Sequence, residues 1–116
     1  MNDRTLLELA AKAAGYKIAE YQDGTEQHHL MGEVFILNNY AYWNPLTDDG
    51  DALRLAVKFQ LQIEHCDYEV VVTEKEYDSG NPIGAAENNA HDPYAATRRA
   101  IVRAAAEMAN KELTND

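Results

Sequence analysis

Apolar residues recur at helical spacing in the N-terminal half of the chain. Residues 3–14 carry Thr5 and Glu8 at capping-box spacing and are followed by Gly15, a residue type that commonly ends helices. Residues 48–58 begin with acidic N-cap candidates, and their apolar stripe consists of Leu53, Leu55, Ala56 and Val57. Both stretches are therefore predicted to form amphipathic helices.

A third helical pattern occupies residues 94–113 and is rich in alanine. Asp92 is placed as its N-cap and Pro93 as its first helical residue. Its predicted buried stripe is Ile101, Val102, Ala105, Met108 and Ala109. Arg99 and Arg103 fall on the more exposed side. The small alanines would let this helix lie close against a sheet.

Alternating and β-branched runs predict the strands, at residues 16–21, 30–37, 40–43, 59–64 and 68–75. Residues 65–67 are placed as a hairpin tip, and residues 77–90 carry only a weak pattern in which residues 79–82 indicate a loop. The resulting fold class is α+β, with a mostly antiparallel sheet of about four or five strands sandwiched between helices. The predicted order is α-β-β-α-β-β-α.

The 116 residues predict one domain spanning residues 1–116, and 46% hydrophobic residues are enough for a folded core. The single cysteine, Cys66, excludes an internal disulfide and a multi-cysteine zinc site, and it favours a reducing compartment. No apolar run reaches the roughly 20 residues of a membrane span. We therefore expect a cytoplasmic protein without a cofactor.

The charge is strongly negative and unevenly distributed. The formal net charge is −10, which argues against direct attraction to nucleic acid or to an anionic membrane. Residues 48–78 contain nine acidic and three basic residues, a net of −6, whereas residues 93–113 contain four basic and two acidic residues, a net of +2. An acidic sheet side and a mildly basic last helix are predicted, although solubility alone would also explain the acidity.

Several residues have the types found in metal or nucleophile sites. The acidic residues 48–51 could bind a hard cation, but they lack the spacing of a calcium loop, and helix capping is favoured. His28 and His29 are adjacent, so in a strand they would point to opposite faces. His65 and Cys66 could pair as base and nucleophile, but neighbours on a hairpin seldom have that geometry. We predict no metal site and no catalytic residue.

The candidate partner-binding residues are acidic and aromatic. The acidic set is Asp67, Glu69, Glu74, Glu76 and Asp78. The candidate aromatic anchors are Tyr40, Tyr42 and Tyr77. The core is favoured for Trp43, the only tryptophan. The basic cluster Arg98, Arg99 and Arg103 could hold phosphates or an acidic partner, but a solvated helix face is favoured.

Three blocks of the chain resemble a family of small bacteriophage and prophage proteins described as the phage ABA-sandwich domain family. They are TLLELAAKAAG at residues 5–15, WNPLTDDGDALRLAV at residues 43–57 and DPYAATRRAIVRAAAE at residues 92–107. The resemblance implies a layered fold of helices, sheet and helices. It also implies a phage accessory protein made inside a bacterial host cell. Small acidic phage proteins of this kind are often inhibitors of host defence, among them the anti-CRISPR proteins.

The expectation from charge and resemblance together is a non-enzymatic binding protein. It would bind a host defence complex, most concretely a Cas effector complex, and block nucleic-acid engagement as a monomer or homodimer. Two alternatives stay open. One is a protein that sequesters a small ligand or nucleotide through Arg98, Arg99 and Arg103, and the other is a self-associating phage structural protein.

Overall fold

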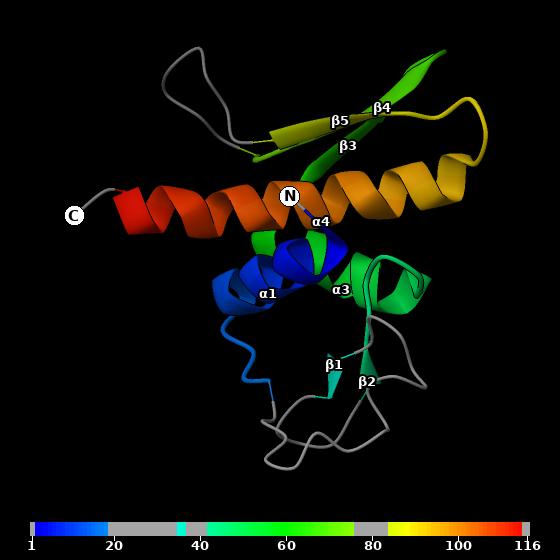
Figure 1. Cartoon of the computed structure of the whole chain (residues 1–116). Coiled ribbons are helices and arrows are strands. Elements are labelled where there is room, and N and C mark those ends of the chain that lie inside the picture. The colour runs from blue at the N-terminus through cyan, green and yellow to red at the C-terminus, as the bar shows by residue number, and fades with distance from the viewer. Residues whose placement is uncertain (1, 19–34, 37–41, 76–83, 115–116) are drawn as a thin grey trace.

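The computed structural model describes residues 2–18, 35–36, 42–75 and 84–114. The chain has an α+β fold (Figure 1). Its elements are α1 (Asp3–Ala14), β1 (Phe35–Ile36), β2 (Tyr42–Trp43), α3 (Asp49–Phe59), β3 (Gln62–His65), β4 (Glu69–Thr73), β5 (Gly84–Asn88) and α4 (Pro93–Thr114). Only parts of the strands predicted at residues 16–21, 30–37 and 40–43 lie within the described residues.

The described strands form two separate antiparallel sheets. β1 pairs with β2, and the other three strands form a sheet in the order β3-β4-β5. In this sheet Val72 of β4 lies opposite Ile63 of β3 and Ala85 of β5. The antiparallel pairing agrees with the prediction, and the strand number and order of the whole chain stay a prediction.

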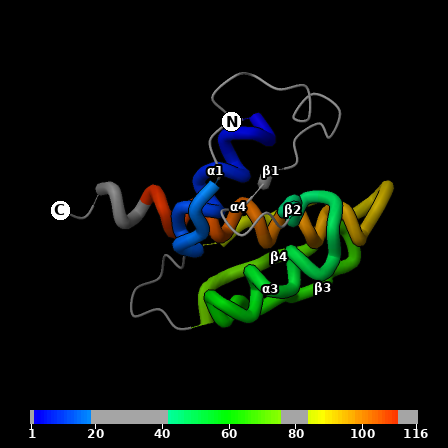
Figure 2. The backbone as a smooth tube through the Cα atoms, turned by 90° about the horizontal axis from the view of Figure 1, so that it is seen from below, coloured from blue at the N-terminus to red at the C-terminus, as the bar shows by residue number. Residues whose placement is uncertain are grey.

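Helix α4 forms the middle layer of the described structure. It contacts β4 and β5 on one side and α1 and α3 on the other (Figures 1 and 2). The prediction that helices enclose the sheet is wrong for the described residues, because all three helices lie on one side of it. The alanines of α4 explain the arrangement, since they are buried on several sides of the helix rather than along one stripe. The buried alanines are Ala96, Ala100, Ala104, Ala105, Ala106 and Ala109.

The predicted limits of α1 are confirmed, but its cap differs. Asn2 is the N-cap, and its side-chain oxygen accepts a hydrogen bond of 2.8 Å from the Thr5 N–H. Thr5 lies inside the helix, so its capping-box spacing with Glu8 does not mark the beginning of the helix. Gly15 ends the helix at φ 78°, a left-handed conformation that costs glycine little.

Helix α3 begins where predicted, but it buries a different face. Leu53 and Val57 are 60% and 68% exposed, whereas Ala52, Leu55 and Ala56 are buried. The predicted stripe is therefore wrong for Leu53 and Val57 and confirmed for Leu55 and Ala56. Phe59, predicted to begin a strand, is the last residue of the helix. Gln60 follows at φ 53° and turns the chain into β3.

The turn before α3 is held by buried polar contacts beside Trp43. Trp43 is 4% exposed, which confirms its predicted place in the core, and its ring meets that of Tyr16 edge-on at 5.6 Å. The Asn44 N–H donates to Asp51 Oδ2 at 2.9 Å, and both residues are buried. The beginning of α3 is thereby fixed against the tryptophan turn.

Strand β5 is not predicted by the sequence, because residues 77–90 carry only a weak pattern. Its pairing with β4 brings the two backbones so close that a Cβ at Gly84 would collide with the Val72 carbonyl oxygen. A glycine at this position therefore permits the strand. The prediction for α4 is confirmed at its beginning, since Asp92 Oδ1 accepts from the N–H groups of Tyr94 and Ala95 at 3.0 and 3.1 Å.

Candidate functional site

The β3–β4 hairpin is the candidate functional site, and its tip is tied down by backbone contacts. The Cys66 N–H donates to the Glu69 carbonyl at 2.8 Å, which closes a two-residue loop of Asp67 and Tyr68. Asn89, just beyond β5, donates from its backbone N–H to Tyr68 O and from Nδ2 to Cys66 O, both at 3.2 Å. The predicted hairpin is therefore confirmed, but its tip lies one residue later than expected, since His65 ends β3 and Tyr68 belongs to the loop.

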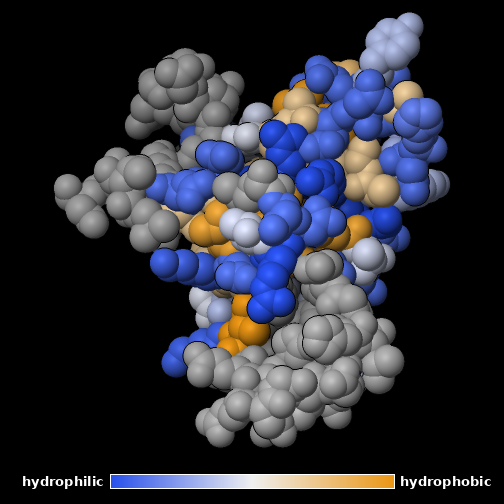
Figure 3. Space-filling model, in the orientation of Figure 1, coloured by the Kyte–Doolittle hydropathy of each residue, from blue (hydrophilic) through white to orange (hydrophobic). Residues whose placement is uncertain are grey.

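Three carboxylates surround this tip. Glu64, Asp67 and Glu69 are exposed, and within the described residues none of them makes a salt bridge. The neighbouring sequence supplies no counter-charge either, because no lysine or arginine occurs between Lys58 and Lys75. Hydrophilic side chains predominate over the sheet end of the face seen in Figure 3. The tip is a concentrated site of negative charge.

The Cys66 thiol reports the local electrostatic potential. Desolvation raises its pKa, and the negative charges of Glu64, Glu69 and Asp67 raise it further. A raised pKa keeps the thiol protonated near neutral pH, which is the opposite of what a nucleophilic cysteine requires. The environment of Cys66 therefore does not favour nucleophilic chemistry at this residue.

An exposed aromatic ring stands among the carboxylates. Tyr68 is 80% exposed, and a shallow hollow of about 300 Å³ lies beside it. The hollow is lined by Cys66, Asp67, Tyr68, Glu69 and Asn88. Tyrosine and a small hollow in one place are typical of recognition surfaces. Sequence reasoning did not select Tyr68 or Glu64, although the predicted hairpin tip was a signal that could have identified both.

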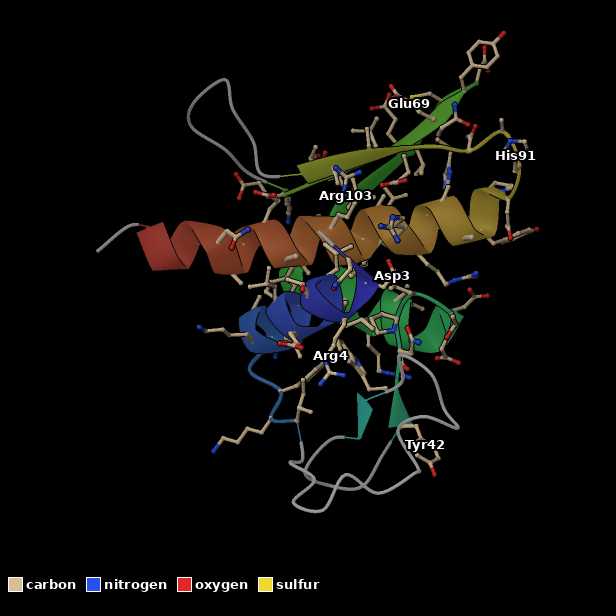
Figure 4. All side chains as sticks on the ribbon, in the orientation of Figure 1. Asp3, Arg4, Tyr42, Glu69, His91 and Arg103 are labelled. Carbon is tan, nitrogen blue, oxygen red and sulfur yellow. The ribbon has the colours of Figure 1, made fainter. Side chains whose placement is uncertain are left out.

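The residues predicted to bind a partner do not form one surface. Asp67 and Glu69 lie at the hairpin tip, and Glu74 is half-buried just after β4. Tyr42 is 61% exposed but projects from β2 at the opposite end of the molecule from Glu69 (Figure 4). Grouping Tyr42 with the acidic residues was therefore wrong. The remaining predicted residues, Tyr40, Glu76, Tyr77 and Asp78, lie outside the described residues.

Arg99 and Arg103 are occupied by contacts within the molecule. Arg99 Nη1 donates to Asp3 Oδ1 at 2.8 Å, and its Nε lies 3.8 Å from Glu87 Oε2. Arg103 donates to the Ala86 carbonyl at 3.0 Å and pairs with Glu87. Figure 4 shows Arg103 reaching from α4 toward the sheet. The predicted solvated face is wrong here, because the two side chains connect α4 to α1 and β5.

Arg98 is also structural. Its Nε donates to the Leu46 carbonyl at 2.8 Å, and its Nη1 pairs with Asp49 Oδ1 at 2.7 Å. A hollow of about 350 Å³ does lie beside the other two arginines, lined by Leu6, Glu87, Arg99, Arg103, Ala106 and Glu107. A phosphate entering it would have to compete with carboxylates that already neutralise the guanidinium groups. The geometry gives the nucleotide alternative little support.

The acidic residues 48–51 serve the beginning of α3. Asp48 Oδ2 accepts from the Asp51 N–H at 2.8 Å, and Asp51 Oδ1 accepts from Arg54 at 2.7 Å. Helix capping was therefore the correct interpretation of this cluster. Within the described part of the chain, no group of three or more His, Cys, Asp or Glu side chains is arranged to hold a metal ion. His28 and His29 lie outside that part.

No helix among the described residues is long and apolar enough to cross a membrane. Comparison with known proteins gave no family model, no curated protein and no solved structure that matches this chain.

Proposed function

We propose that this chain is a non-enzymatic binding protein whose acidic β3–β4 hairpin docks onto a basic surface of a protein partner. The observation that carries the proposal is the set of three carboxylates, Glu64, Asp67 and Glu69, without salt bridges in the described structure and grouped around an exposed Tyr68. By contrast, the ionic side chains Arg98, Arg99 and Arg103 on α4 are paired within the molecule.

Physical chemistry supports binding through this hairpin. Carboxylates that lack internal partners keep their full attraction for an external cation, which speeds association and suppresses acidic competitors. Tyr68 adds apolar contact area that ionic contacts alone lack. The hydrogen bonds from Asn89 hold the tip in place, so that little conformational freedom is lost on binding.

The resemblance to the phage ABA-sandwich domain family gives the proposal its biological setting. On that basis the chain is a phage-encoded inhibitor of host defence, acting in the cytoplasm of a bacterial cell as a monomer or homodimer. The partner would be a defence complex with a basic surface, and a Cas effector complex has such a surface where it holds nucleic acid. The acidic hairpin would occupy that surface in place of the nucleic acid.

The test is recovery of a partner by the tagged protein from a bacterial host lysate at low and high salt. The informative variant is Asp67→Lys/Glu69→Lys, which reverses two charges at the tip. Its matched control is Glu8→Lys/Glu107→Lys, which makes the same change in net charge at exposed helical positions away from the tip.

The proposal predicts that wild type and control recover a basic, nucleic-acid-handling complex at low salt, and that the hairpin variant does not. Recovery that falls equally in both variants would assign the effect to net charge and contradict the hairpin assignment. Recovery that is insensitive to salt would contradict the electrostatic mechanism.

A further inference from the structure

Strand β3 is an uncovered edge of the described three-stranded sheet. It is the first strand in the order β3-β4-β5, and all four of its residues are exposed. Helix α4 packs against β4 and β5, so β3 extends beyond the helix. Ile63 shares a face with the buried Val72 and is still 37% exposed. This edge offers both backbone hydrogen-bonding groups and an apolar side chain to a partner.

The hairpin closure determines which backbone groups of β3 point outward. The bond from Cys66 N–H to Glu69 O makes these residues a hydrogen-bonded pair. Such pairs alternate along an antiparallel ladder, so Glu64 bonds across to Val71 whereas Ile63 and His65 are in non-hydrogen-bonded pairs. The N–H and C=O groups of Ile63 and His65 are therefore directed away from β4, toward solvent.

The two faces of the edge differ chemically. Ile63 and His65 face the α4 side, because they lie opposite the buried Val72 and Val70. Glu64 lies opposite Val71 on the other face, where Glu69 of β4 also projects. In a strand added to β3, every second residue would therefore lie on the face of Ile63, an apolar side chain. The residues between them would lie on the face of the carboxylates of Glu64 and Glu69.

We propose that the β3 edge accepts an extended segment of the partner as an added antiparallel strand, with apolar and basic residues alternating along it. The inference rests on the proposed function and adds the mode of binding and the chemistry of the bound segment. The charge of this region favours a basic segment at the β3 edge, because residues 59–74 contain four acidic residues and no lysine or arginine. A second copy of this chain would bring the same carboxylates together, which disfavours pairing of two β3 edges.

The probe for this proposal is a fluorescein-labelled peptide of alternating lysine and valine, with binding followed by fluorescence anisotropy at low salt. Two control peptides carry N-methyl groups, one on the valine amides and one on the lysine amides. In antiparallel addition the peptide residues that bond to Ile63 and His65 lie on the same face as these residues, so they are the valines. All three peptides have the same charge.

Valine methylation should weaken binding at least about tenfold, because it removes the backbone donors that face β3. Lysine methylation should leave the affinity within about a factor of two to three, the level of context effects. The proposal would be overturned if the parent peptide did not bind, or if only lysine methylation weakened binding. It would also be overturned if the two methylated peptides bound with equal affinity, whether or not that affinity was lower than that of the parent. Self-association through β3, seen in sedimentation and abolished by His65→Pro, would overturn it as well.

These outcomes are separable from failure of the proposed function. If both methylated peptides bind like the parent while Asp67→Lys/Glu69→Lys still loses the lysate partner, the hairpin docks by charge without adding a strand. If that variant keeps its partner, the proposed function is wrong whatever the peptides do. A His65→Pro variant gives a second test, since it removes one outward donor while leaving the ladder bonds to β4 in place.

Discussion

Replacing Asp51 by alanine should destabilise the chain more than the loss of a surface ion pair would. Asp51 is 8% exposed, and its Oδ2 accepts the N–H of Asn44, a residue that is 7% exposed. Its other oxygen accepts from Arg54, whose side chain is 66% exposed. The mutation therefore leaves a buried backbone donor without an acceptor and also removes a solvent-screened contact. The first effect should dominate.

The expected magnitudes follow from these environments. A buried donor left without a partner costs about 1–3 kcal/mol, so Asp51→Ala should lower the free energy of unfolding by about 2–3 kcal/mol. Asp51→Asn keeps an oxygen for Asn44 but loses the charge, which should cost about 1 kcal/mol. Arg54→Ala should cost less than either, because exposed ion pairs contribute little.

Urea denaturation followed by the fluorescence of Trp43 measures all three variants, because this single tryptophan is buried beside the turn that Asp51 holds. The order of destabilisation should be Asp51→Ala, then Asp51→Asn, then Arg54→Ala. If Arg54→Ala is as damaging as Asp51→Ala, the ion pair rather than the backbone hydrogen bond holds the turn, and the reasoning is refuted.

Three further predictions concern other elements. Gln60→Gly should raise the free energy of unfolding by about 1 kcal/mol in urea, because Gln60 ends α3 at φ 53° and glycine adopts this conformation at lower cost; a loss of stability would contradict it. Glu87→Ala should lower the free energy of unfolding by about 1–2 kcal/mol, because Arg103 loses a half-buried partner. An unchanged urea midpoint would show that the pair of Glu87 and Arg103 contributes nothing to stability. The pH midpoint for iodoacetamide alkylation of Cys66 should lie above that of a free cysteine and fall in Asp67→Asn, because removing a negative charge favours the thiolate; a wild-type midpoint at or below that of free cysteine would contradict the raised pKa.

The sequence predicted the helices better than their buried faces. Caps and periodicity located α1, α3 and the beginning of α4, because these signals are local. The buried face of α3 was predicted correctly for Leu55 and Ala56 but wrongly for Leu53 and Val57, which were chosen for their size in place of the small Ala52. The face that the helix buries depends instead on where the bond between Asp51 and Asn44 holds its first turn. That constraint links residues seven positions apart through a turn.

Strand β5 and the arginine contacts depend on the tertiary structure. Residues 84–88 read Gly-Ala-Ala-Glu-Asn, which has no β-branched or aromatic residue, and they form a strand because β4 and α4 supply its partners. Arg99 contacts Asp3, which is 96 positions away in the sequence. Sequence reasoning could assign a mild positive charge to α4, but it could not show that this charge is neutralised inside the molecule.

The candidate site was only partly predicted. The hairpin tip and two of its carboxylates, Asp67 and Glu69, were selected correctly as neighbours because a hairpin is a local structure. Tyr42 was added to them from composition alone, and the fold places it at the other end of the molecule (Figure 4). Tyr68 was overlooked because its strand-like context suggested pairing rather than exposure.

The central claim is that the hairpin tip contacts the partner, and Cys66 allows a direct measurement. It is exposed at the tip and is the only cysteine in the chain, so a bulky maleimide can be attached there alone. The control is Cys66→Ser/Glu107→Cys carrying the same adduct on α4. We predict that the adduct at Cys66 abolishes recovery of the salt-sensitive partner and that the adduct at position 107 does not. Undiminished recovery with Cys66 modified would contradict the claim.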